Sequence, residues 1–296
     1  MENNIEKLNL ICGVCGSDDA FFWFKKNFFN LYKCRKCGLI FTKAVADASE
    51  VYSEDYFSGA KNGFGYVDYD KDKQAMTNTF EFYLDKVEEF SVKKRSLLDV
   101  GTATGYFLEL AKFKNWDAIG VEISEFAASK AREKGFRVIT GTIEDLLNYD
   151  ERFSVVTMWD VIEHVPNPVG TLAAANKLLL NGGVIAINTP DSGSLFAKIM
   201  GKNWHLLVPP EHLIIFNRKN LSFLLQRQGF EILFTAKMGK KFTIQYVFQI
   251  LANWRRDFVL FKKLANFFAG NFLGRISLPI NLRDNFFIIA RKHENN

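Results

Sequence analysis

Short apolar runs alternate with amphipathic segments from Ser96 to the end of the chain. The runs have the length of strands, whereas the segments between them carry apolar residues at the three- and four-residue spacing of helices. Strands are predicted near 96–101, 117–123, 137–141, 153–161, 183–190, 231–238 and 285–292, and helices at 104–114, 124–135, 167–180 and 218–229. The alternation predicts an α/β fold on a doubly wound, seven-stranded, mostly parallel sheet.

Other segments stand outside this alternation. A cysteine-containing segment occupies 1–44, and a stretch rich in Gly, Ser, Asp and aromatic residues follows at 45–68. A further helix is predicted before the first strand of the sheet, with Met76, Phe80, Tyr83, Leu84 and Val87 on its apolar face. We therefore expect a small N-terminal unit at 1–44, an aromatic linker at 45–68, and a large domain at 69–296 with a helical insertion at about 241–275.

All four cysteines lie near the N-terminus in the pattern C-x2-C-x18-C-x2-C, formed by Cys12, Cys15, Cys34 and Cys37. Two residues between paired cysteines let one tight turn aim both thiolates at one ion, and four thiolates make a closed tetrahedral zinc site. We therefore expect structural Zn²⁺ in a zinc ribbon at 1–44. Two disulfides are the alternative, but they suit an exported chain. The role of the ribbon stays open between nucleic-acid contact, substrate cover and dimer contact.

The composition is that of a globular protein. The 296 residues are 48% hydrophobic, and neither a basic, apolar leader nor a run of about 18 uncharged apolar residues occurs. The net charge is +5, and residues 239–296 hold 10 Lys or Arg against 3 Asp or Glu. We expect a cytoplasmic location, with the basic character concentrated at the C-terminal end.

Polar residues follow the predicted parallel strands, where open α/β sheets bind ligands. The first strand is followed by a glycine turn, Gly101 to Gly105, and the second ends near Glu122, whose carboxylate could take both hydroxyls of a ribose. After the third strand, Ile143 offers an apolar face for a purine, with Glu144 or Asp145 near its amine. A dinucleotide fingerprint is disfavoured, because Ala103 and Tyr106 stand at its second and third glycine positions. A single nucleoside is expected.

Five segments together resemble the class I S-adenosylmethionine-dependent methyltransferases: LLDVGTATGYFLELAK, AIGVEIS, MWDVIEHVPNPVGTL, LLLNGGVIAINTPD and WHLLVPPEHLIIFNRKNLSFLLQRQGFEI. The resemblance spans about 69–238. It is strongest to the branch that includes ubiquinone-biosynthesis O-methyltransferases and the zinc-ribbon methyltransferases of bacterial sugar and surface-glycan pathways. This chain departs from the family at Ala103, where a glycine is usual.

The resemblance implies S-adenosyl-L-methionine as cofactor, with the glycine turn around its methionine end. Asp99 would lie near the cofactor ammonium, and Asp160 would close that end from the fourth strand. The cofactor-binding residues expected in this way are Asp99, Gly101, Thr102, Gly105, Glu122, Ile123, Thr142, Ile143 and Asp160.

Ionisable residues in two segments are candidates for the chemistry. A hydroxyl acceptor must lose a proton, and His164, just past the fourth strand with Glu163 beside it, is the first candidate base. The alternative is that the pair only caps the next helix. His205, Glu211 and His212 form a second group on a proline-containing loop, which we interpret as a substrate wall. A metal is disfavoured there, because the spacing is not that of known helical ligand sets.

The insertion carries a helical apolar stripe with basic residues between its members. The stripe is formed by Ile244, Val247, Phe248, Leu251, Trp254, Phe258, Phe261, Leu264 and Phe268. Such a stripe serves a lid or a dimer contact, or it rests on a membrane surface, here through 242–273. A lipid-linked glycan would be the matching substrate of a protein peripheral to the inner membrane face.

Three functions follow from these observations. The first is O-methylation of a small molecule, sugar or glycan. The second is RNA base methylation, but nucleic acid is disfavoured because the ribbon has no dense basic patch and no cysteine remains for attack on a pyrimidine. The third is a non-catalytic scaffold, which the set Asp99, Gly101, Gly105 and Glu122 argues against. The acceptor, the methylated atom and the oligomeric state are not specified.

Overall fold

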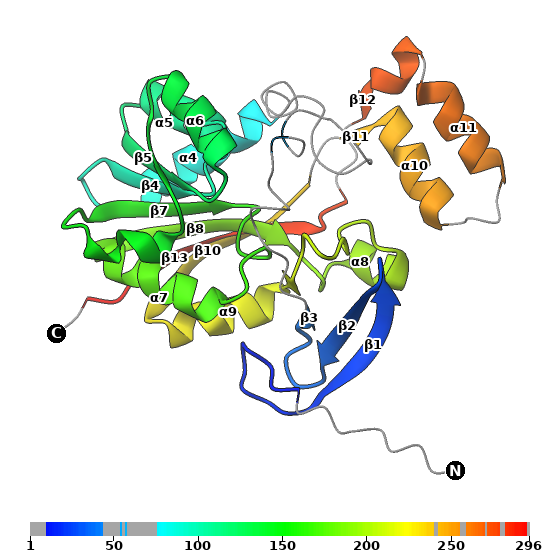
Figure 1. Cartoon of the computed structure of the whole chain (residues 1–296), viewed down its shortest axis with the longest axis horizontal. Coiled ribbons are helices and arrows are strands. Elements are labelled where there is room, and N and C mark those ends of the chain that lie inside the picture. Colours follow the sequence, from blue (N-terminus) through cyan, green and yellow to red (C-terminus); the bar gives the residue numbers. More distant parts are fainter. Residues whose placement is uncertain are drawn as a thin grey trace.

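The computed structural model describes residues 10–43, 54, 57, 76–239, 242–254, 259–269, 271–278 and 282–294. Figure 1 shows a central sheet with helices on both faces, a small N-terminal sheet below it, and a helical hairpin beside it. The predicted linker at 45–68 lies outside the described residues except for Glu54 and Phe57.

The central sheet contains seven strands within the described residues, as the alternating pattern predicts. Its last strand in the chain is antiparallel to both neighbours, and the others share one direction. In spatial order the strands are β10 (Phe230–Met238), β13 (Asn285–Lys292), β8 (Leu179–Pro190), β7 (Phe153–Trp159), β4 (Ser96–Val100), β5 (Asp117–Glu122) and β6 (Arg137–Thr140).

Helices cover both faces of this sheet (Figure 1). Phe80 and Leu84 pack with Leu97 on one face, and Leu172 and Leu221 join the core on the other. Because both faces are covered, the central strands are apolar throughout: every residue of β4 is buried. One face carries α4 (Thr77–Phe90), α5 (Tyr106–Phe113) and α6 (Glu125–Glu133), and the other carries α7 (Pro168–Leu178) and α9 (Arg218–Arg227).

The carboxyl ends of the parallel strands all lie along the same side of the sheet, which is called the carboxyl edge here. The loops that follow these strands therefore gather at this edge. These loops include the turn after β4, the loop 160–167 after β7, and a long connection after β8. Short helical elements lie within them, namely η1 (Ile143–Asn148), α8 (Leu195–Met200) and η2 (Gly201–Asn203). Sequence periodicity did not predict α8, which is a six-residue helix.

The N-terminal sheet crosses the predicted domain boundary. Its first three strands are β1 (Ala20–Lys26), β2 (Phe29–Cys34) and β3 (Ile40–Thr42), and its fourth, β9 (Ile214–Ile215), comes from the large domain. Ile40 pairs with Ile215, and Phe41 with Ile214. The Asn217 Nδ2 also donates to the Cys37 carbonyl at 3.1 Å, and Arg227 Nη1 to the Val14 carbonyl at 3.1 Å. The cysteine segment is thus joined to the large domain through backbone pairing.

The insertion is a helical hairpin closed by two short strands. Its elements are β11 (Phe242–Thr243), α10 (Ile244–Trp254), α11 (Val259–Ala269), η3 (Phe272–Arg275) and β12 (Ser277–Leu278). The predicted single stripe is divided between the two helices, and the rings of Phe248 and Phe268 stack at 5.2 Å with an interplanar angle of 8°. The described part of the stripe therefore serves helix-to-helix packing. No helix among the described residues is long and apolar enough to cross a membrane.

Candidate functional site

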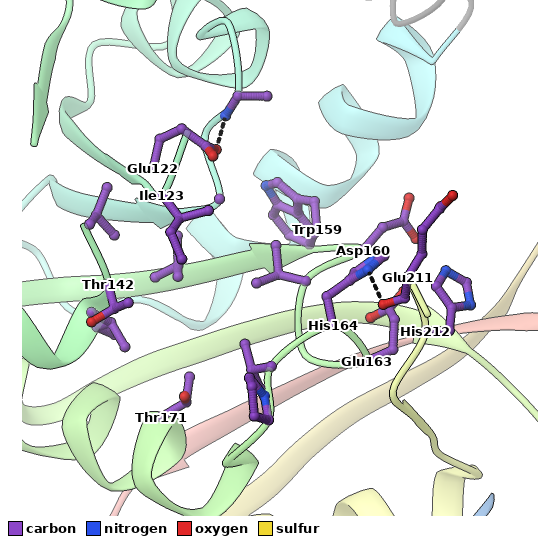
Figure 2. A pocket seen from close by; sticks show the side chains of 18 of the residues that line it. Glu122, Ile123, Thr142, Trp159, Asp160, Glu163, His164, Thr171, Glu211 and His212 are labelled. Atoms are coloured by element: carbon purple, nitrogen blue, oxygen red, sulfur yellow. Dashed lines mark hydrogen bonds between the residues drawn. The ribbon is translucent and has the colours of Figure 1, made fainter. Parts of the chain in front are cut away.

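A cavity of about 740 Å³ opens at the edge where the parallel strands end. Its lining comes from the turn after β4, the ends of β5, β6 and β7, and the segment 205–212 (Figure 2). Expected residues at the lining are Gly101, Glu122, Ile123, Thr142, Ile143, Asp160, Glu163, His164, His205, Glu211 and His212. One continuous cavity therefore joins the residues expected to hold a nucleoside to those expected to meet an acceptor.

Glu122 is a buried carboxylate held by backbone donors. Its Oε2 accepts from the Ala103 N–H at 2.8 Å and its Oε1 from the Ser124 N–H at 2.9 Å. Burial raises the pKa of Glu122, whereas the backbone hydrogen bonds act to lower it. The two donors fix the carboxylate at the cavity wall, where a ligand hydroxyl could meet it.

The turn after β4 brings the backbone close to the cavity. Gly101 has a φ of +70°, and a Cβ at this position would lie 2.5 Å from Val161 Cγ2, so only glycine fits. Ala103 also has a positive φ, 48°, although it carries a side chain. Its methyl group is buried against Phe57 and Ala127. The alanine at the position of the usual middle glycine is therefore accommodated by packing of its methyl group.

Three expected residues, Asp99, Thr102 and Gly105, lie behind the lining rather than in it. Asp99 is buried and its Oδ1 accepts from Thr157 Oγ1 at 2.6 Å. Burial raises the pKa of Asp99 to about 7, against the effect of the Thr157 hydrogen bond. At Gly105, a Cβ would meet Phe136 and Ala131, which points to close helix packing.

The wall after β6 is ordered by local hydrogen bonds. The Thr142 N–H and hydroxyl both donate to Asp145 Oδ2, at 2.7 and 2.9 Å. The Thr171 hydroxyl donates to Glu144 Oε1 at 2.8 Å. Asp145 is therefore occupied as a helix cap, and Glu144, not Asp145, is the acid at the cavity lining.

Asp160 adopts a strained backbone conformation at the end of β7, with a φ of 54°. Asn188 Nδ2 donates to its Oδ1 at 2.7 Å, and the Tyr83 hydroxyl donates to Asn188 Oδ1 at 2.9 Å. Tyr83 also stacks on Trp159 at 4.7 Å. Sequence reasoning missed this support, because Tyr83 reads as one member of an apolar helix face and Asn188 lies inside an apolar strand.

Two histidine rings, His164 and His212, pack edge to face in the other half of the cavity. The Nδ1 atoms of His164 and His212 lie 2.8 Å from the Glu211 carbonyl and 2.7 Å from the Leu206 carbonyl, and the ring centroids are 4.7 Å apart. A carbonyl can only accept, so we assign the proton of each neutral ring to Nδ1 and the basic lone pair to Nε2. Both rings are thus held as bases or ligands.

Glu163 lies beneath the histidines and is fully buried. The Thr189 hydroxyl donates to its Oε2 at 2.8 Å, and its backbone carbonyl accepts from the N–H groups of Leu213 and Ile214. Glu163, His164 and His212 each offer a ligand atom within 4.8 Å of the others. In the described part of the chain this set, and not the sequence-derived group of His205, Glu211 and His212, has metal-binding geometry in the cavity.

His205 is backed by an acid that the sequence did not single out. Its Nε2 lies 3.7 Å from Asp284 Oδ2, which accepts from Trp204 Nε1 at 3.0 Å. Asp284 is fully buried and precedes the last strand of the chain, about eighty residues beyond His205. No short-range pattern links the two residues, so only the folded chain shows the pair.

A methyltransferase-domain family matches residues 76–234, which is more than half of the chain. The chain belongs to this methyltransferase family. The matched region contains the turn after β4, Glu122, Asp160 and the two histidines of the cavity.

Curated relatives match part of the methyltransferase. Ubiquinone biosynthesis O-methyltransferases of Alkalilimnicola ehrlichii and Saccharophagus degradans are 32% and 30% identical over 129 and 146 residues. These matches cover 40% and 46% of this chain and 51% and 61% of theirs. An uncharacterized protein of Methanocaldococcus jannaschii is 34% identical over 102 residues, covering 34% of this chain and 48% of that protein. The chain thus spans about half the length of these relatives.

Solved structures share the fold of the methyltransferase. A protein of Galdieria sulphuraria, described as a sarcosine dimethylglycine methyltransferase, superposes with a TM-score of 0.52 at 12% identity, covering 75% of this chain and 88% of that one. A chain from the Haloferax volcanii complex of the Trm112 activator with a methyltransferase gives 0.53 at 10% identity, covering 77% and 96%. At these identities the likeness shows the fold alone.

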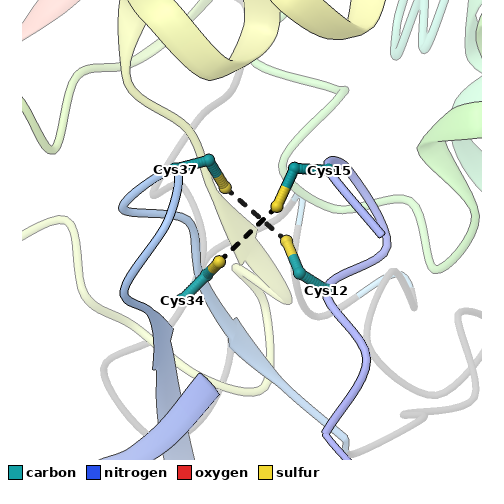
Figure 3. Close-up of side chains that lie close together, drawn as sticks. All are labelled: Cys12, Cys15, Cys34 and Cys37. Atoms are coloured by element: carbon teal, nitrogen blue, oxygen red, sulfur yellow. Dashed lines mark hydrogen bonds between the residues drawn. The ribbon is translucent and has the colours of Figure 1, made fainter. Parts of the chain in front are cut away.

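The four cysteines of the methyltransferase converge on one point (Figure 3). The Sγ atoms of Cys12 and Cys37 are 3.6 Å apart, as are those of Cys15 and Cys34. A disulfide needs about 2 Å, whereas the edge of a tetrahedron with Zn–S bonds of 2.3 Å is about 3.8 Å. The contact between Cys12 and Cys37 lowers the pKa of Cys12 to about 5 and raises the pKa of Cys37, so it favours the thiolate at one of the two positions only. The donor set therefore fits a four-thiolate metal site.

Proposed function

We propose that this methyltransferase transfers a methyl group to the hydroxyl of a small molecule, a sugar or a glycan. The observation that carries the proposal is the His164 ring, held at the cavity with Nε2 as its basic atom by the Glu211 carbonyl. A base is needed for a hydroxyl acceptor, whose proton must leave as the new bond forms. The ubiquinone-biosynthesis relatives are named as O-methyltransferases, which supports the same class of acceptor atom.

The cofactor would occupy the half of the cavity lined by Glu122, Ile143 and Asp160. Glu122 would accept from the ribose hydroxyls, since its carboxylate is fixed by the Ala103 and Ser124 N–H groups. Ile143 would cover the purine, and Asp160, held by Asn188, would face the cationic methionine end. Three other expected residues also line the cavity: Gly101, Ile123 and Thr142. They would bring backbone and apolar atoms close to the ligand.

When bound, S-adenosylmethionine supplies an electrophilic methyl carbon on a sulfonium. The protein then has to orient the acceptor oxygen, exclude water and receive a proton. His164 Nε2 would take the proton, while His205, Glu211 and His212 would wall the acceptor. Glu163, buried beneath the pair and bonded to Thr189, would stabilise the imidazolium that forms.

A second candidate mechanism uses the same residues as metal ligands. Glu163, His164 and His212 could hold a divalent cation that lowers the pKa of the acceptor hydroxyl directly, because their ligand atoms lie within 4.8 Å of one another. The two mechanisms differ in a direct observable. Under the metal mechanism, titration calorimetry should show Mn²⁺ binding to the wild-type protein and loss of that binding in His212→Ala; under the general-base mechanism, the two proteins should not differ in Mn²⁺ binding.

We also propose that the four-cysteine cluster holds one structural Zn²⁺. Four thiolates leave no open coordination position, so such a metal would clamp the N-terminal sheet and take no part in the reaction. The substrate-cover role left open by the sequence is supported by β9, which joins this sheet directly after His212.

The test of the proposal is a transfer assay with methyl-labelled S-adenosylmethionine. The acceptors are a panel of phenols, sugar nucleotides and lipid-linked sugars, with total tRNA and rRNA as the competing class. We expect labelled O-methyl ethers from at least one hydroxyl compound and none from RNA. Label in an RNA base, or methylation at nitrogen or carbon alone, would contradict the proposal.

A further inference from the structure

The helical hairpin, defined here as residues 242–278, projects from the edge of the sheet that carries the cavity. It is inserted between Met238, the last residue of β10, and Asn285, the first residue of β13. β13 runs antiparallel to β8 and to β10, so β10 ends at the same edge as β8. Figure 1 shows the hairpin beside that edge, away from the helices that cover the sheet.

The two helices of the hairpin, α10 and α11, pack against each other through their inner faces. Phe248 of α10 stacks on Phe268 of α11, and Ala252 and Ala265 are buried. Residues 261, 264, 265 and 268 of α11 face inward at helical spacing. The hairpin therefore packs as a unit, and its outer face is a separate surface.

The outer face of α11 carries exposed apolar and polar side chains. Val259, Leu260 and Phe267 are 60%, 53% and 62% exposed, and Leu273 and Ile276, which follow the helix in the chain, are also exposed. Exposed lysines at 262 and 263 lie among them, and positions 259, 263 and 267 share one side because they are four residues apart. Large side chains are exposed in this way on surfaces that meet a partner.

The charged residues of the hairpin are mostly basic. Its sequence contains five basic residues, Arg255, Arg256, Lys262, Lys263 and Arg275, against one acid, Asp257, which is a net +4. The whole chain carries only +5. A face on which apolar side chains and lysines are interspersed matches the surface of an anionic bilayer, where apolar side chains enter the interface and lysines meet the headgroups.

We propose that the hairpin rests on an anionic membrane surface and holds the cavity next to it. The occupant of the outer face is the lipid surface, which fits both its exposed apolar side chains and its net positive charge. A second copy of this chain fits less well, because two hairpins of +4 would repel each other. If the protein is an O-methyltransferase, as proposed above, its position at the membrane also restricts the acceptors. They would be hydroxyl compounds that are anchored in a membrane or adsorbed to it.

The test uses flotation of the full-length protein with vesicles. The two vesicle compositions are phosphatidylcholine alone and a mixture of phosphatidylcholine with phosphatidylglycerol. We expect flotation with the anionic mixture only, and a loss of binding as the salt concentration rises. The combined variant Leu260→Glu and Phe267→Glu should bind at least about tenfold more weakly, because two apolar contacts are replaced by repelled charges.

The matched control is Phe113→Glu. Phe113 is 78% exposed and lies between Lys112 and Lys114 at the end of α5, which returns the chain to the opposite edge of the sheet. This variant should float like the wild type. S-adenosylmethionine binding by each variant checks that the fold is intact, and it separates failure of this inference from failure of the proposed function.

Three results would overturn the inference. The first is wild-type protein that stays unbound with anionic vesicles. The second is equal loss of binding in the Phe113→Glu control. The third is a wild-type dimer, seen by sedimentation without lipid, that becomes a monomer only in the hairpin variant; the outer face would then be an interface between copies.

Discussion

The two halves of the cavity are built in different ways. In the cofactor half, Glu122 bonds to Ala103 and Ser124, and Thr142 bonds to Asp145, so these contacts join residues at most 19 positions apart in the chain. In the acceptor half, His164 bonds to the Glu211 carbonyl, and His205 pairs with Asp284. The first half thus relies mostly on neighbouring strand ends, with Asp160 and its support by Asn188 and Tyr83 as the exception, whereas the second half depends on how distant segments pack.

The N-terminal sheet belongs to the acceptor half. β9 pairs with β3 directly after His212 and Leu213, and the Leu213 N–H donates to the Glu163 carbonyl. The Asn27 Nδ2 donates to the Pro209 carbonyl at 3.2 Å, which ties the β1–β2 turn to the same loop. A substitution at the cysteine cluster should therefore disturb the structure of the segment 205–212 more than the structure around Glu122.

The largest effect is expected from Cys34→Ser. Loss of one of four thiolates should release the zinc, which elemental analysis would detect as metal-free protein. Hydrogen exchange should then rise throughout the N-terminal sheet and at 205–215, while S-adenosylmethionine affinity by calorimetry stays near the wild-type value. An equal rise in exchange near Glu122 would mean that the two halves are not separable.

The next largest effect is expected from His164→Ala. Removal of a general base lowers turnover by about 10²–10⁴, whereas cofactor affinity should change little because His164 lies in the other half. Turnover with the acceptor found in the transfer assay is the measurement. His293→Ala is the matched control, since this exposed histidine lies outside the cavity lining. Unchanged turnover in His164→Ala would transfer the base role to the loop that carries His205 and His212.

Glu122→Gln should weaken S-adenosylmethionine binding by about tenfold or more, because charge-assisted hydrogen bonds to the ribose become neutral ones. Titration calorimetry measures this directly. Glu125→Gln is the control: it removes a nearby carboxylate that is exposed and paired with Arg132. Equal affinity in Glu122→Gln and wild type would show that the ribose binds elsewhere.

The smallest effect concerns pH and Asp99. Its pKa is about 7 in the folded protein and 3.8 when unperturbed, so the folded chain retains a proton that the unfolded chain loses between about pH 4 and pH 7. This group therefore lowers the free energy of unfolding as the pH rises through that window. Asp99→Asn stays neutral, so its melting temperature relative to wild type should rise by a few degrees from pH 4.5 to pH 7.5. A difference that is constant with pH would contradict the raised pKa.

Sequence patterns predicted the helices and strands whose apolar residues recur at a regular spacing. The last strand was expected at 285–292 and is β13 over the same residues, and Glu122 was placed at the end of the second parallel strand. The aromatic linker could not be compared, since most of it lies outside the described residues.

The remaining features depend on tertiary pairing. β9 has only two residues, too few for any periodicity, and it exists because β3 lies beside it. Asp284 acquires its place beside His205 only when the last strand enters the sheet. Likewise, the stripe of the hairpin could be predicted from the sequence, but its division between the packed helices α10 and α11 is seen only in the folded chain.

The central claim is that one cavity binds the cofactor on the Glu122 side and the acceptor on the side of the two histidines. A crystal structure of the protein with S-adenosylhomocysteine tests it most directly. The account predicts the ribose hydroxyls within hydrogen-bond distance of the Glu122 carboxylate, the purine against Ile143, and the sulfur directed toward His164. A nucleoside bound instead over Glu163, His164 and His212 would contradict it.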